Sequence, residues 1–273
     1  MPGKTGMVFW LAAAWLCVVM VSAVSAALWP LPPPDQIDWV NLAVKPGVAG
    51  HLLGTDNMGR DIAARLLFGA RVSLTVGTFA PCIGLVAGTL LGVVAGYYRG
   101  YPEKLIVAAI DTFLAFPRLV FLMMITFVFG SSLLNLTLAL GLMTAPTFAR
   151  VARANTLRFA GREFVLAARG AGAGDAAIIL REILPNVLMP MLAYLLLVMG
   201  LVIIAEGGLG FLGLSVPSPT PSWGGMIAEG REVLEQSPHV SMIPTLVMFL
   251  TIMAVNLIGD RLRGWFDTRE SQL

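Results

Sequence analysis

Residues Arg162 to Asn186 read REFVLAARGAGAGDAAIILREILPN and decide how the rest of the chain is interpreted. This stretch is polar and charged, whereas Leu119–Ala149 before it and Ile183–Ala205 after it contain no charged residue. A charged stretch between two apolar runs, each long enough to cross a bilayer, has to leave the membrane and lie in water. The sequence therefore predicts a membrane protein with a polar loop near its middle.

The composition agrees with a protein that crosses the membrane several times. Hydrophobic residues make up 57% of the 273 residues and charged residues only 12%, against about 25% charged in soluble domains. This excludes an ordinary soluble enzyme. The net charge is +2, and the sequence contains no run of lysine and arginine of the kind that binds nucleic acid. Cys17 and Cys82 lie in apolar runs, so we expect packed thiols rather than a disulfide framework.

We predict an all-α polytopic membrane protein with six transmembrane helices. The first, residues 1–30, is expected to be a retained signal-anchor helix, because its apolar run is longer than that of a signal peptide. Pro117 is expected to kink the third span, and Ser131–Ser132 to form a tight turn after it. The other five spans are expected at about residues 72–98, 102–130, 133–149, 186–205 and 240–258.

Residues 31–71 are predicted to form an extracytoplasmic linker followed by an amphipathic helix. Prolines between Trp29 and Asp35 block both helix and strand. Over residues 57–71 apolar side chains fall on one arc of a helix, and Arg60, Asp61 and Arg65 fall on the other. This pattern is typical of a helix that lies in the membrane interface, with Asp56 or Asn57 as its cap.

Two glycine-containing stretches have different expected roles. Glycines recur every four positions from Gly84 to Gly96, which predicts close packing against another helix. Glu206–Gly213 reads EGGLGFLG and is expected to be bent or re-entrant, with Glu206 solvated or lining the outer mouth of a pathway. Trp223–Leu234 is expected to be a short helix, with Trp223 anchored at the level of the lipid headgroups.

Lysine and arginine predict the orientation. With six spans the basic segments share one side, which is the cytoplasm and holds both termini. The linker, the Ser131–Ser132 turn and the Glu206–Gln236 loop lie on the opposite side. Arg60, Arg65 and Arg71 run against this trend, so we expect them on the surface of the amphipathic helix. The basic segments are Lys4, Arg99–Lys104, the arginines from 150 to 181, and Arg261–Arg269.

The central stretch is predicted to be a compact pair of short helices. Glu163–Arg169 favours helix and Gly170–Gly174 is a break. Asp175 can cap a second helix through Arg181, which Leu184–Pro185 would end. A knob of this form suits insertion into a groove of a soluble partner.

Three motifs carry a resemblance to a known family. AA-x-x-x-G followed by LP, at Ala167, Ala168, Gly172, Leu184 and Pro185, resembles the EAA loop of membrane subunits of ABC importers. Leu166 replaces the acid of that name, and Glu163 lies one turn earlier. Residues 53–74 (LGTDNMGRDIAARLLFGARVSL) look like the N-terminal signature of the C-type subunit of dipeptide/oligopeptide permeases, and residues 206–260 are similar to its C-terminal end.

The resemblance implies a MetI-like fold, with a five-helix core and one additional N-terminal helix. The transmembrane domain would span residues 72–265, with a cytoplasmic coupling loop at 159–186 and a cytoplasmic tail at 266–273. The subunit would pair with a homologous B-type permease and work with two ABC ATPase subunits. An extracytoplasmic solute-binding protein would deliver a peptide substrate.

Particular residues have expected roles, the outer-gate role from their position in the sequence and the coupling role from the resemblance. Glu206 and Trp223 would belong to the pathway or its outer gate. Coupling to the ATPase would fall on Glu163, Ala167, Ala168, Arg169, Gly172, Asp175, Leu184 and Pro185.

Motifs for chemistry are missing from the sequence. No G-x-x-x-x-G-K-[ST] phosphate loop occurs, so ATP and Mg²⁺ would be used by partner ATPase subunits, and no cofactor is expected in this chain. His51 and His239 have no metal-ligand spacing, and no nucleophile elbow is visible. We therefore expect neither catalysis nor a metal site.

Other functions stay open at this point. The same scaffold could import a nickel chelate, glutathione, haem or an antimicrobial peptide. A stand-alone secondary transporter would use Asp111 and Glu206 as proton or ion sites, although no matching inverted repeat is visible. An intramembrane enzyme has the least support, because no paired catalytic groups are found.

Overall fold

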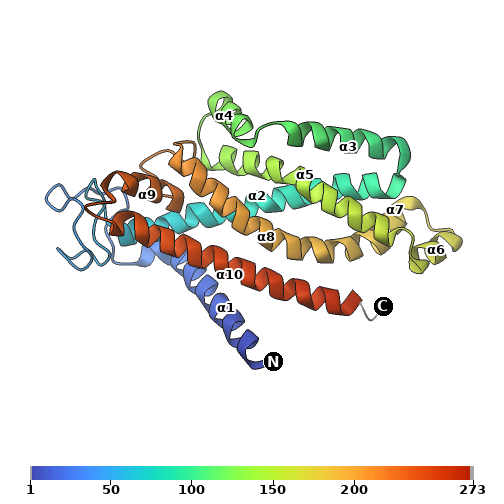
Figure 1. The fold of residues 1–273 in the computed structure, drawn as a ribbon, viewed down its shortest axis with the longest axis horizontal. Helices are drawn as coiled ribbons and strands as arrows, with labels where there is room; N and C mark the ends of the chain where they lie inside the picture. Colours follow the sequence, from blue (N-terminus) through green and yellow to red (C-terminus); the bar gives the residue numbers. More distant parts are fainter. Residues whose placement is uncertain (1, 271–273) are drawn as a thin grey trace. The chain divides into compact units, whose positions relative to one another are not determined.

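The computed structural model describes the backbone of residues 2–270 and the side chains of residues 6–264, and every regular element in that part is a helix. The all-α fold class is thereby confirmed. In chain order (Figure 1) the elements are α1 (Pro2–Ser25), η1 (Ala26–Leu28), α2 (Ile62–Tyr98), α3 (Gly100–Ala115), α4 (Arg118–Phe129), α5 (Leu133–Phe159), α6 (Glu163–Gly170), α7 (Asp175–Ile178), η2 (Ile179–Ile183), α8 (Leu184–Phe211), α9 (Trp223–Gly230), η3 (Arg231–Val233) and α10 (His239–Glu270).

Within the described residues four helical segments are long and apolar enough to cross a membrane. The pair α3 and α4 would make a fifth span, although the two helices are bent by 85°. α5 lies where a further span was expected, but its second half carries Arg150, Arg153 and Arg158. The count of six therefore stays a prediction. The four segments are Gly6–Leu28, Ile62–Tyr98, Asp175–Phe211 and His239–Gly264.

The chain forms two compact units, each of which draws on separate parts of the sequence. The first unit holds the chain up to Thr78, then Ile125–Thr137 and Met199–Ile258. The second holds Phe79–Met124, Leu138–Val198 and the chain from Gly259 onward.

In the first unit α2 begins at Ile62 and continues without a break to Tyr98, so the separate amphipathic helix predicted over residues 57–71 is wrong. Its first turn is capped by Asp61, whose Oδ1 accepts the Ala64 N–H at 2.8 Å. Asp56, one of the two expected caps, instead accepts backbone N–H groups of Met58 and Arg60 in the preceding turn. The local sequence therefore forms a structured turn and a helix start.

Two arginines at this helix start are buried, and their predicted surface position is wrong. Arg60 and Arg65 are both almost inaccessible to solvent. Their Nη2 atoms each lie 2.7 Å from Oε2 of Glu229, and Arg60 Nε lies 2.7 Å from Oδ2 of Asp56. Buried charges persist when they are paired. The polar arc that indicated an exposed face instead joins α2 to α9.

The linker before α2 is held by side-chain contacts of the same unit. His51 Nδ1 lies 2.7 Å from Asp61 Oδ2 and its Nε2 3.6 Å from Asp38 Oδ2. A hydrogen bond from the Asn41 side chain lowers the pKa of Asp38 below its ordinary value, so this carboxylate stays charged beside His51. His239 of α10 contacts the Val44 carbonyl at 2.9 Å. The linker lacks helix, as predicted, but it is an ordered cap on the unit.

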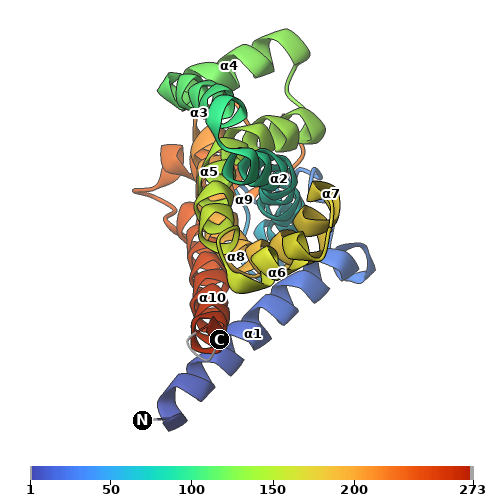
Figure 2. The ribbon, with the colours of Figure 1, turned by 90° about the vertical axis from the view of Figure 1, so that its right-hand side faces the viewer.

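In the second unit α2 and α5 lie side by side (Figures 1 and 2), and their contact confirms the predicted glycine packing. A Cβ on Gly92 would lie 2.6 Å from Ala152 Cβ, and one on Gly96 would lie 2.7 Å from Thr156 Cβ. Atoms do not approach so closely, so only glycine permits this spacing. Glycine at every fourth position places these contacts on one face of α2.

The predicted kink at Pro117 is confirmed by the 85° bend between α3 and α4. Pro117 lies in the short break between Ala115 and Arg118, where its missing N–H removes no helical hydrogen bond. Phe113 and Phe121 meet edge to face across the bend, with ring centres 5.2 Å apart. At the C-terminus α10 extends to Glu270, into the tail predicted over 266–273, while residues 271–273 lie outside the described residues.

Replacing Gly92 by alanine tests the close packing of α2 on α5. We expect Gly92→Ala to destabilise the protein by about 1–3 kcal/mol, because the methyl group forces the helices apart. Gly208→Ala is the matched control, since Gly208 is also helical and a methyl group there would have no atom within 4 Å. The measurement is the unfolding midpoint in detergent. Equal midpoints for the two variants would contradict the packing described.

Replacing Glu229 by glutamine tests the buried ion pairs. We expect Glu229→Gln to cost about 3 kcal/mol, because two buried guanidinium groups lose their shared carboxylate. Asp111→Asn is the control, because it breaks the Asp111–Arg150 pair, whose side chains are 54% and 57% exposed, and such pairs contribute about 0–1 kcal/mol. Denaturant unfolding of both variants would give these values, and a loss no larger than that of the control would be inconsistent with a buried cluster.

Candidate functional site

The central stretch forms the predicted pair of short helices, α6 and α7, within the second unit. α6 ends in a closed turn: the Ala173 N–H donates to the Ala168 carbonyl at 3.0 Å, and the Ala171 N–H to the Ala167 carbonyl at 2.9 Å. Gly172 has φ of +83°. A bond that reaches back five residues, around a residue of positive φ, is the usual way in which glycine ends a helix. This explains why the AA-x-x-x-G spacing needs glycine at 172.

The second short helix does not end at Leu184–Pro185, and that prediction is wrong. The helical run continues from Asp175 through Phe211. A π-helical turn, η2 (Ile179–Ile183), ends two residues before Pro185. An inserted wider turn relieves the clash between a proline ring and the preceding turn and leaves no N–H unpaired. α7 is thus continuous with α8.

Asp175 does not cap its helix, contrary to expectation. Gly174 occupies the cap position and no side-chain cap bond is formed there. The Asp175 carboxylate instead accepts a hydrogen bond from the Tyr97 hydroxyl at 2.6 Å. Arg169 Nη2 donates to the same hydroxyl at 3.3 Å. From the sequence, Tyr97 was expected only near the end of a span. Asp175 lies 78 residues further along the chain, so no local pattern predicts this contact.

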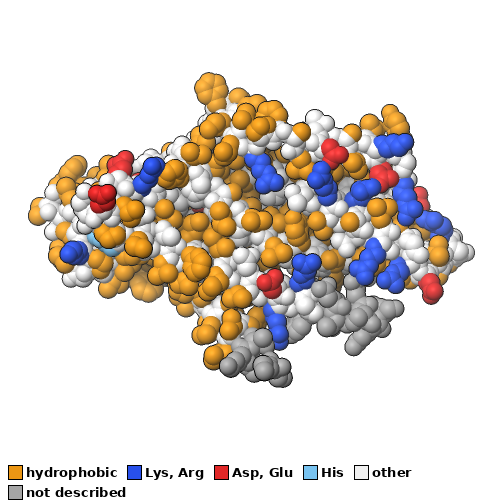
Figure 3. All heavy atoms as spheres, viewed as in Figure 1, with side chains coloured by type: hydrophobic (Ala, Val, Ile, Leu, Met, Phe, Trp, Pro, Cys, Tyr) orange, Lys and Arg blue, Asp and Glu red, His pale blue; other side chains and the backbone are white. Residues whose placement is uncertain are grey.

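The outer surface of this pair of helices is both apolar and charged. Val165 and Ile178 are buried, while Phe164, Leu166 and Leu180 are exposed. Glu163, Arg169 and Asp175 are exposed as well, and Figure 3 shows charged side chains gathered around α6 and α7. Exposed large apolar side chains with a charged rim are typical of a protein-binding surface.

The structure buries Glu206, so its predicted solvated position is wrong. α8 stays helical from Glu206 to Phe211, without the expected bend. Glu206 is fully buried in the first unit, and its carboxylate accepts hydrogen bonds from Ser215 Oγ at 2.7 Å and Ser73 Oγ at 3.1 Å. Buried carboxyl groups need such donors. Glu206 thus joins α8, the following loop and α2.

Trp223 is also fully buried, rather than exposed at a membrane interface. Its backbone N–H donates to Ser73 Oγ at 3.2 Å, and its indole Nε1–H donates to the Leu66 carbonyl at 3.1 Å. Ser73 therefore connects Trp223 with Glu206. The two residues that were expected at an outer gate share one hydrogen-bonded cluster in the first unit.

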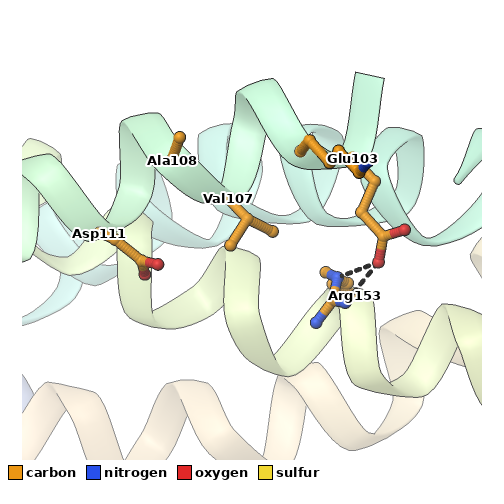
Figure 4. A pocket seen from close by; sticks show the side chains of 6 residues that line it. Glu103, Val107, Ala108, Asp111 and Arg153 are labelled. Carbon is orange, nitrogen blue, oxygen red and sulfur yellow. Dashed lines mark hydrogen bonds and ion pairs between the residues drawn. The ribbon is translucent and has the colours of Figure 1, made fainter. Parts of the chain in front are cut away.

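An open hollow of about 440 Å³ lies between α3 and α5 in the second unit (Figure 4). Glu103 forms an ion pair with Arg153 across it, and Asp111 is paired with Arg150 at 2.6 Å. Val107 and Ala108 supply its apolar wall. Both acids form ion pairs with arginines of α5. We therefore interpret the hollow as part of the packing between α3 and α5.

An all-helical chain with several apolar spans and a glycine-closed pair of short helices between them has the form of a transporter membrane subunit. The chain belongs to the family of binding-protein-dependent transport system inner membrane components, which it matches over residues 88–272. It is thus a multi-pass inner-membrane permease subunit of an ABC importer, a class that works with ATPase and binding-protein components. Membership of this family argues against the alternative that the chain is a stand-alone secondary transporter.

Two similar relatives have names that include glutathione transport. The glutathione transport system permease protein GsiD of Pectobacterium atrosepticum is 36% identical over 260 residues, which cover 94% of this chain and 86% of that protein. The protein of the same name from Escherichia coli is 38% identical over 259 residues, with 94% and 85% covered.

Solved structures show the same fold. The inward-facing MetNI methionine ABC transporter gives a TM-score of 0.63 at 19% identity, over 74% of this chain and 96% of the other. An amino acid ABC transporter with histidines gives 0.53 at 16% identity, over 76% and 94%. The MetI-like ABC permease fold expected from the sequence is confirmed.

Removal of the Glu206 carboxylate tests the buried cluster. We expect Glu206→Ala to destabilise the protein by about 1–3 kcal/mol, because two buried hydroxyl groups lose their acceptor. Glu206→Gln keeps one acceptor oxygen and should lose less. Glu235→Ala, at an exposed position, is the control and should change the stability by less than about 0.5 kcal/mol. The same small change in Glu206→Ala would argue against the cluster.

Proposed function

We propose that this chain is the C-type permease subunit of an importer for short peptides, with glutathione as the first candidate cargo. The cargo proposal is supported by the relatives, which carry glutathione transport in their names and match 94% of this chain. Glutathione is a tripeptide and therefore falls within the class implied by the signature at residues 53–74. A homologous B-type subunit would supply the other half of the pathway.

In this proposal the α6–α7 pair is the coupling element that a partner ATPase subunit grips. The closed turn at Gly172, with its exposed apolar and charged surroundings, supports the proposal most strongly. Phe164 and Leu166 would enter a groove of the ATPase, and Arg169 would contact its rim. Ala167 and Ala168 present their small side chains where the partner backbone comes close. Leu184 and Pro185 join the element to α8.

The orientation follows from the basic residues. The α6–α7 pair and both termini would lie in the cytoplasm, where the ATPase is, by the excess of arginine around them. The ordered linker before α2, together with α9, would face outward and meet the binding protein. Glu206 and Trp223 would then hold the outer ends of α2 and α8 in place, as parts of an outer gate. ATP hydrolysis would belong entirely to the partner subunits.

Uptake measurements distinguish the cargoes. We would express the complete importer in cells that lack their own peptide uptake systems, and follow labelled glutathione and labelled dipeptides. Glutathione uptake that requires this subunit supports the proposal, and uptake of dipeptides alone would move the cargo to other short peptides. Uptake of haem or of a nickel chelate in place of any peptide would overturn it.

A charged side chain at Gly172 tests the coupling role. We expect Gly172→Asp to abolish cargo-stimulated ATP hydrolysis while the subunit is still inserted, because positive φ disfavours aspartate and the carboxylate intrudes on the contact surface. Gly47→Asp carries the same backbone strain, at φ of +80° in open space, away from the element. Undiminished stimulation in Gly172→Asp would contradict the docking role.

A further inference from the structure

Tyr97 stands at the C-terminal end of α2 and contacts both short helices of the coupling element. Its hydroxyl donates to Asp175 Oδ1 at 2.6 Å, at the start of α7. It also accepts from Arg169 Nη2 at 3.3 Å, near the end of α6. The Arg169 guanidinium lies 5.9 Å from the centre of the tyrosine ring, within the range of a cation–π contact. One side chain thus bridges the glycine break from outside.

The helix that carries Tyr97 is tightly joined to a second one. Gly96 directly precedes Tyr97, and it packs on Thr156 of α5 with no room for a side chain. Gly92 meets Ala152 one turn earlier in the same way. Helices that interlock with so little free space move together, because packed interiors yield little to strain. A movement of Tyr97 therefore moves both α2 and α5.

We propose that Tyr97 is a positioning residue that passes movement of the α6–α7 pair to α2 and α5. The proposal rests on the coupling role of α6–α7 given above. When the ATPase pulls on the short helices, the hydrogen bonds of Tyr97 to Asp175 and Arg169 transmit the pull to the end of α2. α8 receives the same movement through the continuous helical run from Asp175. The two routes together make the helices of the second unit respond to one input.

The contacts are suited to transmission rather than to stability. Arg169 and Asp175 are exposed and Tyr97 is half-buried, and hydrogen bonds in such positions contribute little to folding. Coupling depends on a contact that differs between two states, and a free-energy difference of that kind changes function without unfolding the protein. A variant that lacks the hydroxyl should therefore fold, assemble and still fail to couple.

The experiment uses the complete importer with its binding protein in liposomes, and measures cargo transported per ATP hydrolysed. In Tyr97→Phe the ring stays and the hydroxyl is lost. We expect cargo per ATP to fall by about fivefold or more, with assembly, melting temperature and ATP hydrolysis close to wild type. Tyr98→Phe is the control, because Tyr98 is the exposed neighbour and its hydroxyl forms no hydrogen bond with the described residues.

Asp175→Ala and the double variant complete the test. Asp175→Ala should lower cargo per ATP, and adding Tyr97→Phe should lower it little further, because both changes remove one contact. A wild-type ratio in Tyr97→Phe would overturn the proposal, and so would a loss of assembly or a lowered melting temperature. Gly172→Asp separates the two levels: if it acts and Tyr97→Phe does not, only the role of Tyr97 fails. If Gly172→Asp has no effect, the coupling role itself fails.

Discussion

Inside a bilayer the backbone has to satisfy its own hydrogen bonds, and this constraint explains where the chain is helical and where it is not. The long runs α2, α8 and α10 stay helical throughout, although each has a proline in its interior, whose missing N–H removes one helical hydrogen bond. The break at residues 171–174 is the opposite case. It is closed by its own backbone bonds around Gly172 and lies among exposed charged residues. A break of that kind is stable in water and exposes side chains, as the proposed contact with an ATPase requires.

Close packing between helices then determines which parts of each unit can move separately. The glycines of α2 allow α5 to lie against its backbone, and Gly224 of α9 allows the same at Gly210 of α8. In the first unit the buried Arg60 and Arg65, paired with the half-buried Glu229, hold the linker and α9 on the start of α2. Each unit is thus firm within itself. In the proposed coupling role, movement delivered at α6 and α7 would be carried by helices rather than absorbed in loose packing.

The sequence predicts those features that depend on local chemistry. Residue type and spacing predict the apolar runs, the kink at Pro117, the glycines of α2 that pack on α5, and the break at residues 170–174. Burial by partners far along the chain could not be predicted. Arg65 and Glu229 form one ion pair across 164 residues, and the helical pattern around Arg65 alone indicated an exposed face. Glu206 is hydrogen-bonded to Ser73 across 133 residues, in addition to the nearby Ser215, and Tyr97 meets Asp175 across 78 residues.

The most direct test of the central claim is the side of the membrane on which the α6–α7 pair lies. Ala171→Cys, in a variant without Cys17 and Cys82, would be exposed to a membrane-impermeant thiol reagent in intact cells and in inside-out vesicles. If the α6–α7 pair is cytoplasmic, Ala171→Cys is labelled only in the vesicles and is protected when the ATPase subunits are bound, while Leu52→Cys in the linker is labelled in intact cells. Labelling of Ala171→Cys in intact cells would show that the α6–α7 pair lies outside and rule out its coupling to the ATPase.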